Sequence, residues 1–432
     1  MQERLTKKQA EEYLEQVRGY GSKMGLDAMR DLLARLQNPQ SSLRFIHIAG
    51  TNGKGSQLAY LSNILAKAGY KTGCYVSPVV FDDKEKIQIN GKNITRLNFL
   101  ELLTRIKSVT DEMLEEGVAN PTIFEIETAL SFLYFKQESC DLVVLETGLG
   151  GLLDATNVVE NTEAAVFTSI SMDHMDYLGD TLQKIAKIKA GIIKNGCYVI
   201  TQNQKSEVLE VLENEAAEKN CPFFQAELKE LKKVKYGFEK QYFTYGELEQ
   251  LEIRLPGKHQ VENAQLAVKT IQTLRIKGYQ ISDEAIRTGL KATKWPGRME
   301  VIGEKPKFII DGAHNQDAAA RLAESIRLYF KGKHIIYIMG ILKDKEYEKI
   351  VQETYAYADQ IITVTTPNLD RTLKAYDLAM VVKEYHPNVT VADSLEEAIE
   401  MSYLLSTRQS VIICFGSLSF LGEVKKIMKK RN

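Results

Sequence analysis

The chain has 432 residues, more than one hydrophobic core normally serves, so we expect two domains. Its hydrophobic content of 44%, charged content of 26% and formal net charge of -1 give no electrostatic case for binding nucleic acid or an anionic membrane. Residues 1–8 are polar and charged, and no apolar run approaches the ~18 residues of a membrane span. The five cysteines are scattered and lack metal-ligand spacing, which is typical of reduced thiols. We therefore expect a cytoplasmic protein. We also expect small-molecule partners and a monomer, although none of these features determines the oligomeric state.

Strands and helices are expected to alternate over the first two thirds of the chain. Thr6 and Gln9 form a capping box that opens the first helix, and Asn90 with Gly91 indicates a hairpin turn. The expected strands are 45–49, 70–78, 141–146, 164–170 and 199–201, and the expected helices are 6–17, 27–36, 58–68, 97–116, 124–138, 182–193, 206–219 and one that begins at 257. Residues 232–255 predict a small antiparallel addition.

Trp295, Pro296 and Gly297 interrupt this pattern and mark the expected domain boundary. Beyond it, strands are expected at 308–310, 335–339, 361–365, 389–391 and 411–415, and helices at 318–330, 345–357, 373–385, 395–404 and the C-terminus. The pattern predicts an α/β fold with two domains. Residues 1–294 would form a P-loop-type domain with a mostly parallel sheet, and residues 295–432 a doubly wound, Rossmann-like domain.

Residues 45–56 carry the most informative local pattern, an apolar run followed by the sequence GTNGKGS and a helical repeat. Strand, glycine loop and helix in this order point backbone N–H groups and a helix N-terminus at a phosphate, and Lys54 adds a mobile positive charge. The usual phosphate-loop pattern is not met, because Gly55 intervenes between Lys54 and Ser56. The segment predicts a nucleotide-phosphate loop; a glycine-rich turn without a ligand stays open as the alternative.

Four expected strand ends carry polar side chains, namely Lys54, Ser77, Glu146 and His174. Ligands of open α/β sheets gather outside the carboxyl ends of the strands. Together with phosphate oxygens, Ser77, Glu146 and His174 could complete an octahedral divalent site, most naturally for Mg²⁺, although Mn²⁺ tolerates a histidine as well. Taken singly, the three side chains are equally compatible with a turn serine, a solvated glutamate and a helix-capping histidine.

Lys189 and Arg298 each have two interpretations. Lys189 lies on a basic helical segment, so residue physics alone favours a solvated or ion-paired surface lysine. Arg298 follows the domain boundary and could reach a γ-phosphate across a cleft, or it could pair with Glu300.

Two further strand ends lie in the second domain. Asp311, His314 and Asn315 bunch on one turn, where Asn315 could also serve as a helix N-cap. Ser417 follows the last expected strand, and it could line a site for a small anionic substrate or simply start a helix.

Read together, these segments resemble the Mur ligase superfamily, and within it the folylpolyglutamate synthase/dihydrofolate synthase family. The matching segments occur in family order over nearly the whole chain. They are residues 47–56, 77–78, 124–125, 146–157, 173–194, 257–264, 295–298, 311–315 and 416–417.

The resemblance implies an ATP-dependent amide ligase that adds L-glutamate to a reduced folate, and perhaps also to dihydropteroate. In that family the acceptor carboxylate attacks the γ-phosphate of MgATP to give an acyl phosphate, and the amine of glutamate then displaces phosphate. Positioning and charge neutralisation are the tasks that such a reaction leaves to the protein.

The resemblance also assigns residues to roles. Catalytic roles fall to Lys54, Lys189, Asp311 and His314, and Lys189 matches a lysine that the family carbamylates. ATP contacts fall to Asn52, Gly53, Lys54, Gly55, Ser56, Asn263, Arg298 and Asp311, and the Mg²⁺ ligands to Ser77, Glu146 and His174. The substrate region comprises Phe124, Glu125, Leu153, Asp154, Ala155 and Ser417. A second Mg²⁺ and a monovalent cation are compatible with this pattern.

Four positions depart from the family pattern. Val79 and Val80 replace His-Leu, Leu152 replaces an arginine, Ile188 replaces a glutamate, and Lys86 stands where arginine is common. These positions surround the expected acceptor site and leave the acceptor open. The alternatives are a divergent ligase that joins an amino acid to another carboxylate, such as a cell-wall precursor, and an ATP-binding regulator without turnover.

Overall fold

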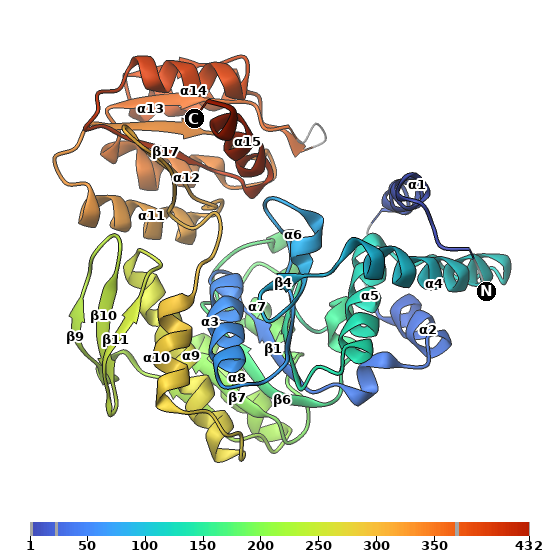
Figure 1. The fold of residues 1–432 in the computed structure, drawn as a ribbon. Helices are drawn as coiled ribbons and strands as arrows, with labels where there is room; N and C mark the ends of the chain where they lie inside the picture. The colour runs from blue at the N-terminus through green and yellow to red at the C-terminus, as the bar shows by residue number, and fades with distance from the viewer. Residues whose placement is uncertain (1–2, 22–24, 368–370, 432) are drawn as a thin grey trace.

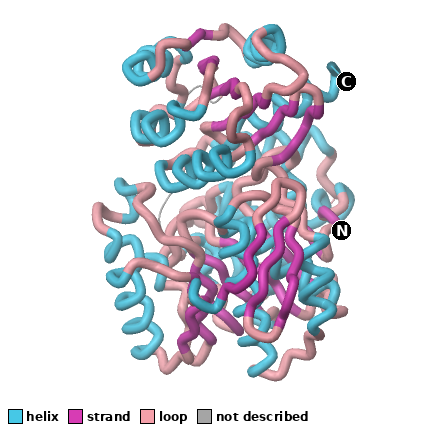
Figure 2. Tube along the Cα trace, turned by 90° about the vertical axis from the view of Figure 1, so that its left-hand side faces the viewer, coloured by secondary structure: helices cyan, strands magenta, loops and turns pink. Residues whose placement is uncertain are grey.

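The computed structural model describes residues 3–21, 25–367 and 371–431. Two α/β units lie one above the other (Figures 1 and 2). The larger unit contains an eight-stranded sheet and a three-stranded sheet, and the smaller unit a six-stranded sheet. The predicted two-domain α/β fold is therefore confirmed, while the boundary at residue 295 stays a prediction.

The larger unit follows the expected order of elements. It begins with α1 (Lys7–Arg18), α2 (Asp27–Arg35), β1 (Phe45–Ala49), α3 (Lys54–Lys67), β2 (Thr72–Tyr75), β3 (Ile87–Ile89), β4 (Lys92–Asn93), α4 (Arg96–Glu115), α5 (Ile123–Gln137) and β5 (Leu142–Glu146). It continues with β6 (Thr162–Phe167), α6 (Met175–Leu178), α7 (Leu182–Ala190), β7 (Tyr198–Gln202), α8 (Ser206–Glu218) and β8 (Phe223–Ala226). The capping box of Thr6 and Gln9 opens α1 as predicted.

The large sheet has the strand order β4-β3-β2-β5-β1-β6-β7-β8 and is parallel except at β3 and β4. Strands β2, β5, β1 and β6 are neighbours, so their carboxyl ends meet at one edge of the sheet. This confirms the expected convergence of four strand ends, because parallel neighbours must end on the same side.

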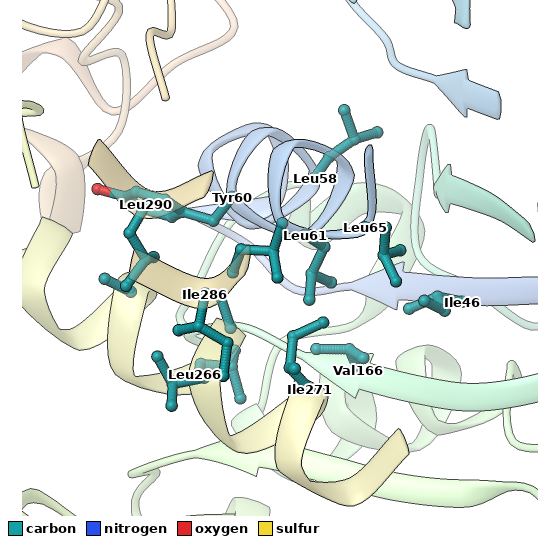
Figure 3. Close-up of a cluster of buried hydrophobic side chains, with 14 of the residues drawn as sticks. Ile46, Leu58, Tyr60, Leu61, Leu65, Val166, Leu266, Ile271, Ile286 and Leu290 are labelled. Atoms are coloured by element: carbon teal, nitrogen blue, oxygen red, sulfur yellow. The ribbon is translucent and has the colours of Figure 1, made fainter. Parts of the chain in front are cut away.

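Strand β1 is buried along its whole length, which explains its unbroken apolar sequence. Alternate side chains point to opposite faces. Ile46 and Ile48 pack with α3, α9 (Lys258–Ile276) and α10 (Asp283–Ala292) in the cluster drawn in Figure 3. Phe45 packs on the other face with α1, α2, α4 and α5. Both faces of the sheet are therefore covered at β1.

The small sheet consists of β9 (Leu231–Lys235), β10 (Gln241–Tyr245) and β11 (Leu248–Ile253), and it is antiparallel as predicted. Its β9–β10 turn carries Phe238, whose ring packs against Tyr329 and Phe330 of the smaller unit at centroid distances of 5.6 and 5.2 Å. The addition therefore contacts the second unit directly.

The smaller unit has the strand order β12-β13-β17-β14-β15-β16, with only β12 antiparallel. Its elements are β12 (Glu300–Glu304), β13 (Lys307–Ile310), α11 (Gln316–Tyr329), β14 (Ile335–Met339), α12 (Tyr347–Thr354), β15 (Gln360–Thr363), α13 (Ala375–Tyr385), β16 (Val389–Val391), α14 (Leu395–Leu404), β17 (Val411–Phe415) and α15 (Leu421–Arg431). No helix in the described ranges combines the length and the apolar content that crossing a bilayer requires.

Strands β8 and β12 were not predicted. Each is an edge strand of four or five residues, and none of the β12 residues is fully buried. An edge strand with one partner needs no continuous apolar run, so its sequence pattern is weak.

Candidate functional site

The phosphate loop (residues 50–56) joins the end of β1 to the start of α3, as predicted. Gly53 has φ +91°, and a Cβ on it would lie 2.8 Å from Oδ1 of Asn263. A Cβ on Gly55 would lie 2.7 Å from Cζ2 of Trp295. The departure of this loop from the usual phosphate-loop pattern therefore coincides with close packing, since a side chain at position 55 would require the Trp295 indole to shift.

Lys54 folds back over its own loop. Its Nζ donates hydrogen bonds to the carbonyl oxygens of Gly50 at 3.1 Å and Thr51 at 3.3 Å. The ammonium group is thus held at the carboxyl end of β1, where it could contact a bound phosphate.

Lys189 is buried, so its interpretation as a surface lysine is wrong. Its Nζ donates to the same Gly50 carbonyl at 2.8 Å. Burial, aided by the positive charge of Lys54, lowers the pKa of Lys189 to about 7. Leu182, Ile185 and Ala186 are buried on the same helix, at the spacing that also places Lys189 on the inner face of α7. That apolar spacing was the signal in the sequence.

Glu146 is the last residue of β5 and is buried. Burial raises its pKa to about 7, while Lys54, Arg298 and the backbone N–H of Ser77 act in the opposite direction. Its Oε2 has no hydrogen-bond partner among the described residues. An unpaired buried carboxylate oxygen at a strand edge fits a cation ligand.

His174 lies at the start of α6 with φ +52°, and its side chain makes no capping hydrogen bond. The pKa of His174 is lowered, mainly by burial; Asp173 opposes this effect, and the positive charges of Lys345, Lys54 and Lys189 add to it. A neutral imidazole is the form that binds metals. Within residues 3–21, 25–367 and 371–431, no three His, Cys, Asp or Glu side chains gather as a metal site, so a cation here would also depend on Ser77, phosphate and water oxygens.

The Asp311 turn of the smaller unit lies next to Arg298. The Asp311 carboxylate accepts hydrogen bonds from the backbone N–H groups of Met299 and Ala313, both at 2.9 Å, and burial raises its pKa. The Arg298 guanidinium passes close to Gly312, and a side chain at position 312 would require it to shift.

Arg298 does not pair with Glu300, the alternative partner suggested by the sequence. Its Nη1 donates to the Gly297 carbonyl at 3.0 Å, and Glu300 pairs with Lys425 at 2.5 Å. His314 contacts the Gly312 carbonyl through Nδ1 at 2.8 Å, and burial lowers its pKa to about 4. Asn315 caps α11 through a bond from the Ala318 N–H, which confirms that part of the sequence interpretation.

A pocket lies between the two units and brings together most of the residues expected to bind ATP. Its lining includes Asn52, Gly53, Ser56, Asn263, Arg298, Asp311 and His314. The face of α11 adds Ala318, Arg321, Leu322 and Ser325, which no sequence motif predicted. Their only signal is the position directly after the Asp311 turn. His259 also lines the pocket, and its buried Nδ1 has no partner among the described residues.

The residues expected at the acceptor side fall into two groups. The Glu125 carboxylate accepts from the N–H and the hydroxyl of Thr122 at 2.6 and 2.8 Å, so it caps α5. Asp154 accepts from the Leu149 N–H at 2.7 Å and from Thr156, so it holds its own loop together. Both carboxylates therefore stabilise the backbone around the expected acceptor site.

Phe124 and Leu153 remain accessible at the acceptor side. The Phe124 ring lies 6.0 Å from the Tyr75 ring, and it occupies the space of a Cβ on Gly148. Leu153 is 45% exposed, whereas Ala155 is buried. Ser417 is also buried; it bonds to Ser419 at 2.8 Å and caps a short helical turn, which agrees with its interpretation as a helix start.

The residues that depart from the family pattern differ in their surroundings. Leu152 is 50% exposed, whereas the Ile188 side chain packs against Gly150. Lys86 pairs with Glu127 at 2.6 Å, and both side chains are largely buried. Val80 lies against Gly422 of the smaller unit.

Comparison with known proteins gives the same family in sequence and structure. Residues 48–271 match the Mur ligase middle domain, and residues 297–418 match the Mur ligase glutamate ligase domain. The chain is 34% identical to a dihydrofolate synthase/folylpolyglutamate synthase of Bacillus subtilis, over 95% of this chain and 96% of the relative. It is 32% identical to a folylpolyglutamate synthase of Lacticaseibacillus casei, over 92% of each chain.

Solved structures agree with these relatives. A Mycobacterium tuberculosis folylpolyglutamate synthase complexed with ADP and AMPPCP superposes with a TM-score of 0.88 at 28% identity, covering 97% of this chain and 99% of that one. An E. coli FolC in complex with DHPP and ADP superposes with a TM-score of 0.86 at 28% identity, covering 98% of both. The chain belongs to the Mur ligase family and, within it, to the folylpolyglutamate synthase/dihydrofolate synthase group of ATP-dependent folate–glutamate ligases.

Proposed function

We propose that this chain binds ATP between units 1–294 and 295–432 and joins L-glutamate to a reduced folate through an acyl phosphate, with dihydropteroate as a second acceptor. The observation that carries the proposal is the pocket between the units. The phosphate loop lines one side, and the Asp311 turn with Arg298 lines the other. The ADP complexes of the M. tuberculosis and E. coli proteins support the use of an adenine nucleotide.

The chemistry needs two steps. A carboxylate is a poor acyl donor, so an oxygen of the acceptor carboxylate first attacks the γ-phosphorus of ATP, and ADP leaves. The amine of L-glutamate then attacks the acyl carbon, loses a proton and expels inorganic phosphate. Lys54 and Arg298 are the cations that would neutralise charge on the transferred phosphoryl group, with Asn263 and Asp311 holding the rest of the nucleotide.

Ser77, Glu146 and His174 are the residues that would hold Mg²⁺, which supplies charge neutralisation on the phosphates when it is bound. The unpaired Oε2 of Glu146 and the neutral imidazole of His174 support this assignment.

Lys189 is suited to carbamylation. A pKa of about 7 leaves much of its amine neutral, and a neutral amine adds CO₂ to give a carbamate with release of a proton. The product is a carboxylate buried beside Lys54, where it would replace one of two neighbouring positive charges by a negative one. It would also offer oxygens to a second cation.

The acceptor would lie against Phe124, Leu153 and Ala155, outside the carboxyl end of β5. The Asp154 and Glu125 carboxylates hold the surrounding backbone in place. L-glutamate would enter from the smaller unit near His314 and Ser417.

One assay separates the acceptors. The purified protein is incubated with MgATP, L-glutamate and, in separate reactions, tetrahydrofolate, dihydropteroate or a cell-wall nucleotide precursor, and released phosphate and product mass are measured. We expect phosphate release and one added glutamyl unit with the pterin acceptors. Release with the cell-wall precursor alone would contradict the folate assignment, and no release with any acceptor would favour a regulator without turnover.

A further inference from the structure

The side chain of one residue in the phosphate loop bonds only to the smaller unit among the described residues. The side-chain amide of Asn52 donates to Oδ1 of Asn315 at 3.1 Å and to Oδ2 of Asp317 at 2.8 Å. Its oxygen accepts from the Asn315 amide at 3.2 Å. Both partners belong to the start of α11, so all three side-chain bonds of Asn52 cross from one unit to the other.

The position of Asn52 matters because the turn of the phosphate loop follows it directly. Gly53 has φ +91° and Lys54 begins α3, so the orientation of Asn52 sets the direction in which the following N–H groups point. The backbone of Asn52 is tied only loosely, through contacts of 3.4 Å in each direction with Ser169. The bonds of its side chain are the shorter ones.

Asp317 makes the shortest of these contacts. It occupies the second position of α11, where a negative charge already interacts favourably with the helix dipole, and it also accepts from Arg321 at 3.2 Å. Neither of these two interactions requires the carboxylate to reach across to Asn52. Arg321 in turn lies 3.6 Å from Glu262 of the larger unit.

Neighbouring contacts hold the units together independently of Asp317. Asp173 accepts from the Asn315 amide at 2.9 Å and pairs with Lys345 at 3.0 Å, and both side chains of that ion pair are about nine-tenths buried. If the Asp317 carboxylate were removed, these contacts of Asp173 would still join the two units.

We infer that Asp317 is a positioning residue for ATP binding: through the Asn52 amide, its carboxylate holds the phosphate loop in the conformation that receives the nucleotide. The inference rests on the proposed function, because it assigns the phosphate loop to ATP. Tight nucleotide binding would then require contact between the smaller unit and the phosphate loop, in addition to the sequence of the loop.

A double-mutant cycle tests the inference. ADP affinity is measured by calorimetry in the wild type, Asp317→Ala, Asn52→Ala and the double variant. We expect Asp317→Ala to weaken ADP binding about tenfold in the wild-type background, since it removes a hydrogen bond to a charged group, and less than about twofold in the Asn52→Ala background. An equal loss in both backgrounds would overturn the inference.

Two further variants separate positioning from helix stability. Glu396→Ala removes an exposed acidic residue from the same position of α14, and we expect unchanged ADP affinity. Asp317→Asn keeps an oxygen that can accept from Asn52, and we expect it to recover part of the affinity. Equal losses in Asp317→Ala and Glu396→Ala would reduce Asp317 to a helix-stabilising residue.

A measurement without nucleotide covers the case in which Asn52→Ala binds no ADP. Hydrogen exchange of the peptide that spans the phosphate loop should be faster in nucleotide-free Asp317→Ala than in wild type, and unchanged in Glu396→Ala. Identical exchange in all three proteins would overturn the inference. A wild type that binds no ADP at all would instead contradict the proposed function.

Discussion

Two glycine-rich loops meet at the site, and Gly151 of the second loop has a different kind of neighbour from the glycines of the first. In the phosphate loop, Gly53 and Gly55 leave room for side chains that arrive from Asn263 and Trp295, far away in the sequence. In the acceptor loop (residues 147–154), Gly151 leaves room for backbone, because a Cβ on it would lie 2.8 Å from the carbonyl oxygens of both Ile188 and Lys189. Side chains can move aside and helix backbone cannot. We therefore expect the phosphate loop to tolerate an added methyl group better at Gly55 than the acceptor loop does at Gly151.

The largest expected effect concerns that lysine. Lys189→Ala removes the group proposed to carry the carbamate, and we expect kcat to fall at least about a hundredfold, as for the loss of one preorganised charge-stabilising group. Short carboxylic acids added to the buffer should restore part of the activity if a carboxylate is what the site needs. Phosphate release under saturating substrates measures both effects, and unaltered turnover would remove Lys189 from the mechanism.

The next effect compares the two loops directly. Gly151→Ala places a methyl group against the backbone of α7, and we expect a loss of about 1–3 kcal/mol in the free energy of unfolding. Gly55→Ala meets a partly exposed indole that can shift and gains helix propensity, so we expect a change below about 1 kcal/mol. Urea unfolding of both variants gives the comparison. Equal losses would show that the phosphate loop is as rigid as the acceptor loop.

The free energy of unfolding should depend on pH through His47, which lies next to the acceptor loop. The buried His47 ring contacts the Thr156 hydroxyl at 2.9 Å, and burial lowers the pKa of His47 to about 3. Between about pH 3 and 6.5 the unfolded chain binds a proton that the folded chain excludes, so stability falls as pH falls through this window. At pH 5, the lowered pKa of His47 should reduce the free energy of unfolding by about 2 kcal/mol. Urea unfolding at pH 8 and pH 5 should show a smaller difference in His47→Gln than in wild type; an identical difference would contradict this assignment.

The smallest effect on stability is expected at Leu152, which is half exposed in the acceptor loop. Leu152→Arg should change the free energy of unfolding by less than about 0.5 kcal/mol. We expect it to change the KM of the folate acceptor and to leave the KM of ATP unaltered, because position 152 lies outside the pocket between the units. An altered KM of ATP would show that the two loops are coupled.

The position of the candidate site at the carboxyl ends of the strands could be predicted from the sequence. Apolar runs precede Lys54, Ser77, Glu146 and His174, and ligands of open α/β sheets bind outside the carboxyl ends of such strands. The burial of Lys189 was missed because residue type outweighed the apolar spacing of α7. The contact between Gly55 and Trp295 had no local signal, since the two residues are distant in sequence. The same holds for the bonds from Asn52 to α11, which depend on how the two units meet.

The central claim is that ATP activates the acceptor carboxylate at this site, and isotope transfer tests it most directly. A folate acceptor labelled with oxygen-18 in its carboxylate is converted with unlabelled ATP and L-glutamate, and the released phosphate is analysed by mass spectrometry. An acyl phosphate requires one labelled oxygen to appear in each phosphate that is released. Phosphate without the label, formed together with glutamylated product, would contradict the account.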